Sequence, residues 1–155
     1  GGVMNRMRIM TALLLAAMGC MSISEPKADV RIEFRAAANA PAPGLEPMES
    51  PVDDGTVYVA NEPLLWNEHI ASAALLDAMV GRSEISLVFT EEGRERLAEA
   101  TERLKGQRLA IVADGELIAA PVIREAITGG RAVITGVFGP QQARRIADGI
   151  VVGEK

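Results

Sequence analysis

The chain carries few side chains that could perform covalent or metal chemistry. Cys20 is its only cysteine and His69 its only histidine among 155 residues. A histidine-rich metal site cannot be built from one imidazole. The sequence has 21 acidic residues, and hydrolysis by two converging carboxylates would require acids clustered in a deep pocket.

Motifs of the common enzyme classes are absent from the sequence. It contains no Gly-x-Ser-x-Gly sequence, which positions a nucleophilic serine, and no phosphate-binding glycine loop that ends in Lys-Ser or Lys-Thr. The net charge is -5, which argues against a nucleic-acid partner because phosphate binding depends on clustered lysine and arginine. The sequence therefore predicts a protein that is not an enzyme and that uses no cofactor or metal.

The first twenty residues have the pattern of a secretory signal peptide. Arg6 and Arg8 precede an apolar run over residues 9–18, which is too short for the about 20 apolar residues that cross a membrane. The following Ala-Met-Gly before Cys20 resembles the lipobox of bacterial lipoproteins, in which this cysteine is acylated. That resemblance implies a lipid-anchored, exported chain in which Cys20 is not available as a nucleophile for His69. An ordinary signal peptide, cut nearby, is the alternative.

Alternating apolar and polar residues predict several strands. Val30, Ile32 and Phe34 alternate with charged residues and indicate a strand with one buried face. The stretch over residues 36–55 holds four prolines and predicts an exposed connection without a core of its own. Asn67 is expected to cap a brief helix that ends near residue 73. Further strands are expected over residues 56–60, 75–80, 84–89, 108–113, 116–120 and 131–137.

Two longer helices are indicated by their ends and by their apolar faces. Thr90 is a suitable N-cap for a helix that Gly106 would end, and Pro140 is a suitable first residue for a later helix. Apolar residues recur at helical spacing in both segments and predict a buried face on each. These inner faces are Leu97, Ala100, Thr101 and Leu104 in the first helix and Ala143, Ile146, Ala147 and Ile150 in the second.

Paired turn residues separate the strands that follow the first helix. Asp114 and Gly115 lie between two apolar arms and predict a tight hairpin, because such a turn requires positive φ at both central positions. Gly129 and Gly130 are interpreted in the same way, as residues that supply backbone freedom at a turn. Pro121 ends the second hairpin arm because proline cannot donate to a ladder.

This order of elements predicts an α+β domain in which two main helices pack on one face of a largely antiparallel sheet. The expected organisation is a signal peptide with lipobox over residues 1–20, an N-terminal strand with a Pro/Ala-rich linker over 21–55, and the folded domain over 56–152.

An ordered series of short motifs resembles one known family. The segments that carry it are Glu62-Pro63-Leu64-Leu65, Phe89-Thr90 with Gly93, Leu109 to Gly115, Ala120 to Ile123, Glu125 to Gly130, Ile134-Thr135-Gly136, and Phe138 with Ala143 and Ala147. Together they resemble the head of the first periplasmic domain of the protein-export membrane protein SecD. The resemblance implies an α+β head outside the cytoplasmic membrane, in a family that assists Sec-dependent export and contacts the emerging preprotein.

Two departures from the SecD pattern shape the expected function. The chain is expected to lack the transmembrane helices that follow the head in SecD, and also the base that holds the head, because little sequence lies between Cys20 and Val30. The chain is therefore expected to be a stand-alone lipoprotein that cannot itself couple a proton gradient to movement.

The resulting hypothesis is a non-catalytic binding module that contacts unfolded preprotein or the Sec translocon. The alternative is an envelope adaptor or inhibitor that uses the same domain for an unrelated protein partner. A sheet edge or the loop around Pro121 to Arg131 would supply the surface. Candidate contact residues are Pro121, Arg124, Glu125, Arg131 and Trp66, although packing over the core is the favoured interpretation of Trp66.

Overall fold

The protein is described here by a computed structural model, which covers residues 28–52, 54–76, 83–136 and 139–151. The predicted signal peptide and Cys20 lie outside these described residues. In chain order the elements are β1 (Ile32–Ala38), β2 (Leu45–Glu49), β3 (Thr56–Trp66), the 3-10 turn η1 (Asn67–His69), β4 (Ile70–Leu76), β5 (Ser83–Phe89), α1 (Glu91–Arg103), β6 (Arg108–Ala113), β7 (Glu116–Ala119), β8 (Arg131–Gly136) and α2 (Pro140–Ile150).

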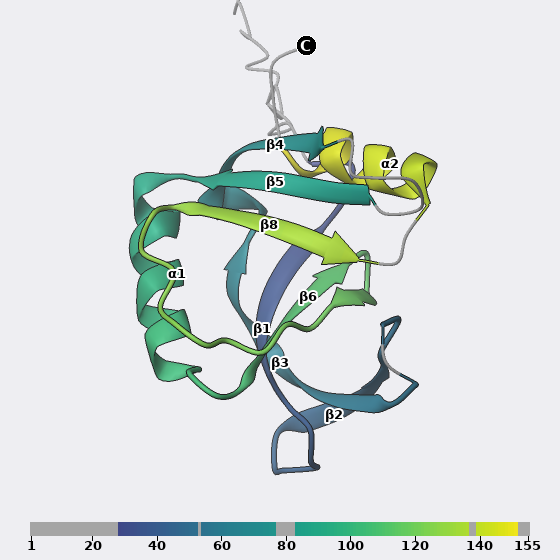
Figure 1. The fold of residues 1–155 in the computed structure, drawn as a ribbon, viewed down its shortest axis with the longest axis vertical. Helices are drawn as coiled ribbons and strands as arrows, with labels where there is room; N and C mark the ends of the chain where they lie inside the picture. Colours follow the sequence, from purple (N-terminus) through teal and green to yellow (C-terminus); the bar gives the residue numbers. More distant parts are fainter. Residues whose placement is uncertain (1–27, 53, 77–82, 137–138, 152–155) are drawn as a thin grey trace, which may run out of the picture.

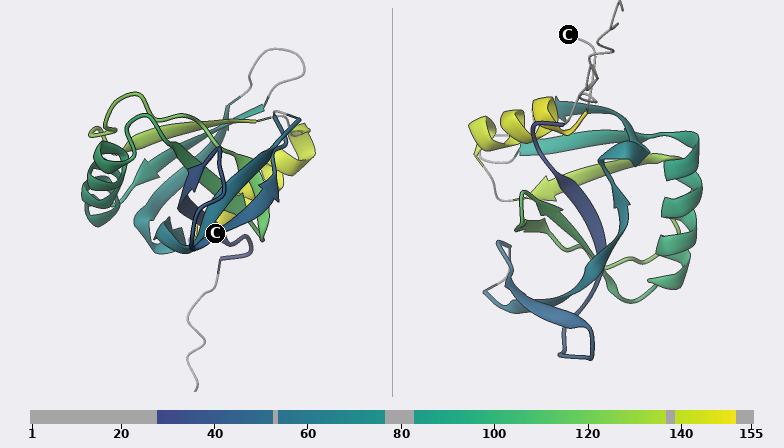
Figure 2. Two further views of the ribbon diagram at one scale, coloured as in Figure 1. Left: turned by 90° about the horizontal axis from the view of Figure 1, so that it is seen from below. Right: turned by 180° about the vertical axis from the view of Figure 1, so that it is seen from behind.

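The strands form two antiparallel sheets. The first has the order β2-β3-β1-β6-β7 and the second the order β4-β5-β8, as Figure 1 shows. Helix α2 packs against β4 and β5, whereas α1 contacts β3, η1 and β5, and Figure 2 shows the two helices on opposite sides of the molecule. The predicted α+β class is confirmed, while the division of the strands between two sheets was not predicted.

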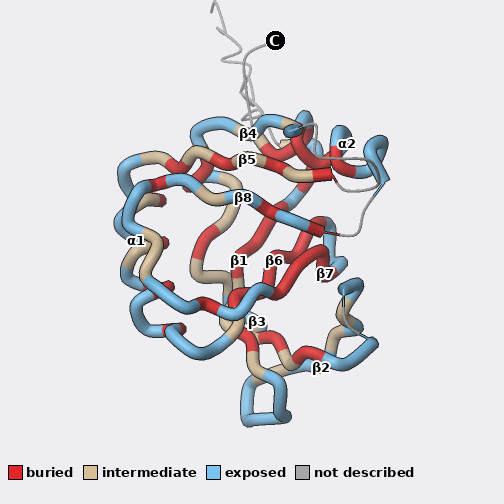
Figure 3. The backbone as a smooth tube through the Cα atoms, viewed as in Figure 1, coloured by how far each residue is buried: buried red, intermediate tan, exposed pale blue. Residues whose placement is uncertain are grey.

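The main core lies between the two sheets and the helices. Phe34 of β1 and Phe89 of β5 meet edge to face, with ring centroids 5.6 Å apart. The predicted inner faces of both helices are buried in this core or beside it, and Figure 3 shows the buried backbone concentrated on the central strands. The 3.6-residue periodicity of the two segments thus identified their buried faces correctly.

A second, smaller apolar cluster lies on the opposite face of the five-stranded sheet. Strand β6 contributes to both clusters, because its successive residues from Leu109 to Ala113 are all buried. The partly buried Met48 of β2 packs against this second cluster, which consists of Ala37, Val57, Val59, Ala110, Val112, Leu117 and Ala120. Strand β2 therefore helps to cover this face of the sheet, whose apolar side chains would otherwise be exposed to solvent.

The predicted ends of α1 and the predicted hairpin are confirmed. Thr90 Oγ1 accepts a hydrogen bond of 3.0 Å from the N–H of Gly93, which caps the helix. At the hairpin, φ is 49° at Asp114 and 83° at Gly115, as a tight turn between β6 and β7 requires. Asp114 also binds the start of β1, because its Oδ1 accepts a 2.9 Å hydrogen bond from the N–H of Arg31.

Three predictions about the N-terminal half differ from the structure, one of them only in the length of a strand. The expected exposed connection over residues 36–55 contains the end of β1 and the whole of β2, and β2 pairs with β3. The expected strand over 56–60 continues to Trp66, and shifts in its register with β1 occur on either side of the Arg35–Pro63 pair. Pro63 lies beyond the residues of β3 that pair with β2, and proline is tolerated at such irregularities. The division into a linker and a domain at residue 56 stays a prediction.

The third error concerns the brief helix expected after Asn67. Only a 3-10 turn forms, and residues from Ile70 onward form β4, which pairs with β5. The N-cap position is held by Trp66 instead of Asn67. The pairing of β4 with β5 therefore determines the structure of this segment, and its local helix propensity does not. Of the strand expected over 75–80, Leu75 and Leu76 belong to β4 and the rest lies outside the described residues.

Candidate functional site

The loop between β7 and β8 presents several of the predicted contact residues. Pro121, Arg124 and Glu125 are all exposed on it. The loop is held by backbone hydrogen bonds from Leu109 N to Pro121 O at 3.0 Å and from Ile123 N to Gln107 O at 2.8 Å. These bonds fix the loop against the start of β6, so the exposed side chains project from an ordered backbone.

The other two predicted contact residues lie on different elements. Arg131 is exposed at the start of β8, where it pairs with Val88 of β5. Trp66 ends β3, where its ring lies 4.3 Å from that of His69 in an edge-on arrangement. The guanidinium of Arg96 lies 5.4 Å from the centroid of the Trp66 ring. These contacts explain Trp66 as a packing residue at the junction of β3 and α1, and a role for it in binding stays a prediction.

His69 is buried and has a structural environment. Its Nδ1 accepts a 3.2 Å hydrogen bond from the N–H of Trp66, and its Nε2 lies 3.7 Å from a carboxylate oxygen of Glu92. Burial lowers the pKa of His69 below its ordinary value, and the nearby Arg96 lowers it further. The neutral imidazole therefore belongs to the packing of η1 against α1.

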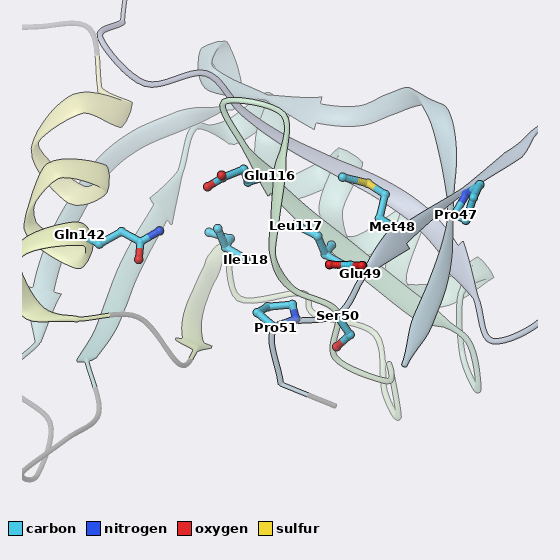
Figure 4. Close-up of a pocket in the computed structure, with 9 residues that line it drawn as sticks. All are labelled: Pro47, Met48, Glu49, Ser50, Pro51, Glu116, Leu117, Ile118 and Gln142. Atoms are coloured by element: carbon cyan, nitrogen blue, oxygen red, sulfur yellow. The ribbon is translucent and has the colours of Figure 1, made fainter. Parts of the chain in front are cut away.

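A groove separates β2 from β7, which are the two edge strands of the five-stranded sheet. Its volume is about 560 Å³, within the range of roughly 300–1,000 Å³ that is usual for ligand sites. Figure 4 shows the side chains that line it, with Met48 extending from β2 toward β7 and Gln142 reaching in from α2. The lining residues are Pro47, Met48, Glu49, Ser50, Pro51, Glu116, Leu117, Ile118 and Gln142.

The backbone of β7 offers hydrogen-bonding groups to this groove. In the pairing of β6 with β7, Ala113 is opposite Glu116 and Val112 is opposite Leu117. The residues that flank a two-residue turn exchange hydrogen bonds, and the next pair does not. The N–H and C=O of Leu117 therefore point away from β6, toward the open edge. Ile118 is the extra residue at an irregularity in this ladder, which keeps the open edge short.

The backbone of β2 has fewer groups to offer. The N–H of Ser50 donates to Gly55 O at 2.9 Å, which makes that pair hydrogen-bonded and places Pro47 and Glu49 in non-bonded pairs with β3. Their outward groups face the free edge, but Pro47 has no N–H to donate. Proline and charged residues at an edge limit indiscriminate pairing with other chains, so β7 is the more open side of the groove.

Sequence reasoning did not identify the groove. It treated β2 as part of a linker and considered the β6–β7 hairpin only for its turn. The combination of Pro47 with Glu46 and Glu49 is typical of an edge strand, and this signal could have indicated β2. β2 and β7 face each other because of the curvature of the whole sheet, which no pattern within one segment can predict.

The groove offers carboxylates, apolar side chains and strand backbone to an occupant. Its lining has the carboxylates of Glu49 and Glu116 but neither a histidine nor a cysteine. Among the described residues, no group of three or more His, Cys, Asp or Glu side chains is placed to hold a metal ion. Within the same part of the chain, no helix has the length and apolar character needed to span a membrane.

Comparison with known proteins identifies a family. A family model described as "SecDF, P1 head subdomain" matches residues 45–153. The SecDF protein translocase subunit of Thermus thermophilus is 47% identical over 85 residues, which are 55% of this chain and 12% of that protein. The SecD subunit of Acetobacter pasteurianus is 36% identical over 113 residues, which are 71% of this chain and 22% of that protein.

A solved structure agrees with these sequence matches. It is described as "Structure and function of a membrane component SecDF that enhances protein export", and it superposes with a TM-score of 0.62 at 32% identity. The match covers 83% of this chain and 64% of that chain. The chain thus spans a minor part of the whole translocase subunits that it matches.

Proposed function

The chain belongs to the family of the SecDF P1 head subdomain, and from this membership we propose that it assists protein export outside the cytoplasm as a non-catalytic binding module. The similar solved protein is described as a component that enhances protein export. The sequence matches cover 12% and 22% of two whole translocase subunits. The proposal therefore concerns what the head alone can do, which is to contact polypeptide or the translocon.

The observation that carries the proposal is the open edge of β7 beside the groove. An edge strand pairs with an extended chain through backbone groups, so the pairing depends little on the sequence of that chain. An export accessory meets many different unfolded proteins and needs this kind of contact. The short edge and its single outward-facing residue, Leu117, favour weak and transient binding.

A second surface is available on the loop that carries Arg124 and Glu125. Both side chains are exposed, and the hydrogen bonds that hold the loop against β6 keep its shape fixed. Such a surface suits a folded partner better than an extended chain, because it presents side chains instead of free backbone groups. We assign it to contact with translocon components.

We also propose that Cys20 is acylated and tethers the mature chain to the cell envelope. Several acyl chains on one residue anchor a protein stably, whereas a single chain binds marginally. A tether would keep the head close to the site where exported chains emerge. Mass spectrometry of the N-terminal peptide tests this directly, since an unmodified Cys20 would remove the anchor from the account.

Crosslinking in envelope membranes tests the proposed function. Photoreactive residues at positions 116 and 124, both exposed, would sample the groove and the loop separately. Recovery of nascent exported chains or Sec subunits supports the proposal. Recovery of one unrelated envelope protein, with no exported chain, would contradict it and favour an adaptor or inhibitor that uses the same domain.

A further inference from the structure

We propose that the groove between β2 and β7 selects extended segments in which apolar residues alternate with lysine or arginine. This inference rests on the proposed function, because it names the class of segment that the head would bind. It concerns the side chains that surround the groove, whereas the proposed function requires only an open sheet edge.

The occupant must be an extended strand because of the backbone at β7. The N–H and C=O of Leu117 point toward the groove, as the hydrogen-bonding pattern of the hairpin requires. A strand that lies beside β7 can donate to and accept from this residue, as the next strand of a sheet does. The turn at Asp114 and Gly115 and the irregularity at Ile118 limit this pairing to a few residues.

The apolar requirement comes from the floor of the groove. Met48 and Leu117 line it from both strands on the face of the sheet where Met48 packs against the second cluster, and Figure 4 labels both at the groove. Side chains of an added strand alternate between its two faces. Apolar residues at alternate positions would therefore contact this floor and gain from burial.

The charge requirement comes from the rim. Glu49 and Glu116 are exposed at the groove, and its nine lining residues include no lysine or arginine. The nearby Arg145 is engaged by Asp114, with Nη1 3.3 Å from the carboxylate oxygen. Basic residues in the bound segment are thus attracted, while acidic residues meet two like charges.

Binding of designed peptides to the full chain tests this selection. One labelled peptide alternates valine with lysine, and its partner has glutamate in place of each lysine. Fluorescence anisotropy should show the lysine peptide binding about threefold to tenfold more tightly, as expected from two solvent-exposed ion pairs. A lysine peptide that is N-methylated at every residue should lose binding, because neither of its edges has an N–H to donate to the C=O of Leu117.

A matched pair of variants locates the effect. Glu49→Gln combined with Glu116→Gln should remove most of the preference for lysine. Glu95→Gln combined with Glu99→Gln makes the same charge change on exposed positions of α1 and should leave the preference intact. All four positions are exposed, and thermal unfolding checks that both variants fold.

The outcomes separate this inference from the proposed function. Loss of preference only in the groove variant supports the inference. The inference is overturned if the two peptides bind equally, or if both variants lose the preference for lysine to the same extent. The proposed function stands in either case. If neither the peptides nor an unfolded exported protein binds, the proposed function fails and the inference fails with it.

Discussion

The backbone of Gly149, near the end of α2, packs against the side chain of Val30, just before β1. The N–H of Val30 donates to Gly149 O at 2.9 Å. A Cβ atom on Gly149 would lie 2.5 Å from Val30 Cγ2, closer than carbon atoms can approach. The glycine inside α2, which lowers helix propensity by about 1 kcal/mol relative to alanine, is thus explained by this close approach.

Gly149→Ala should destabilise the protein although it improves helix propensity. Overpacking of this kind costs typically about 1–3 kcal/mol, which outweighs the gain in propensity. Urea denaturation should therefore show a net loss of up to about 2 kcal/mol. In a Val30→Ala background the same substitution should cost less, and a stabilised single variant would contradict the packing seen here.

Asn67 is expected to stabilise the fold through long-range hydrogen bonds. Its Oδ1 accepts from Ile32 N at 3.0 Å, and its Nδ2 donates to Val30 O and Ile150 O, each at 2.8 Å. Asn67→Ala should lower the free energy of unfolding by about 2–4 kcal/mol, at about 1 kcal/mol for each lost bond.

Asn67→Asp distinguishes these bonds from a capping role. Aspartate and asparagine are equivalent as N-caps, so a capping residue would tolerate the change. Here the carboxylate would face two carbonyl oxygens, and the variant should be at least as unstable as Asn67→Ala. Near wild-type stability in chemical denaturation would show that the bonds contribute little.

His69 should make stability depend on pH below neutrality. Burial and Arg96 lower its pKa in the folded protein, whereas an unfolded histidine titrates near 6.5. As the pH falls below that value the unfolded chain takes up a proton that the folded chain resists, so stability decreases. The loss continues until the pH passes the lowered pKa of the folded state.

The control for this prediction is His69→Asn, whose Oδ1 can still accept a hydrogen bond from the N–H of Trp66. The variant does not titrate in this range, so the difference in unfolding free energy between it and the wild type should shrink as the pH falls from 7.5 to 5.5. A difference that stays constant over this range would contradict the lowered pKa.

Exposed carboxylates at the groove should affect binding and leave stability almost unchanged. Glu116→Gln alters a solvated side chain on β7, and surface substitutions of this kind usually change stability by less than about 0.5 kcal/mol. Thermal unfolding should match the wild type closely. A large loss of stability would indicate that Glu116 has a structural role.

The parts of the fold that sequence predicted are those with local signals. Thr90, the face of α1 and the Asp114-Gly115 turn each depend on residues a few positions apart, and all are confirmed. Asn67 has the same local signal as an N-cap, yet its partners lie 35, 37 and 83 positions away. A pattern in one segment cannot contain such partners.

The groove was missed for a related reason. Strand β2 holds Pro47, which reduces strand propensity, and it forms because its pairing with β3 places Met48 over an apolar cluster. Only the fold of the whole sheet brings β2 opposite β7. The family resemblance supplied the fold, and the geometry of the two edges had to come from the structure.

Amide hydrogen exchange of the full chain, with and without an unfolded exported protein, tests the account most directly. The N–H of Leu117 faces the open edge in the free protein and should exchange rapidly there. Pairing with an extended chain should slow exchange at this amide and its neighbours in β7, while the interior strand β5 stays unchanged. Equal exchange along the whole chain in both conditions would contradict recognition through the sheet edge.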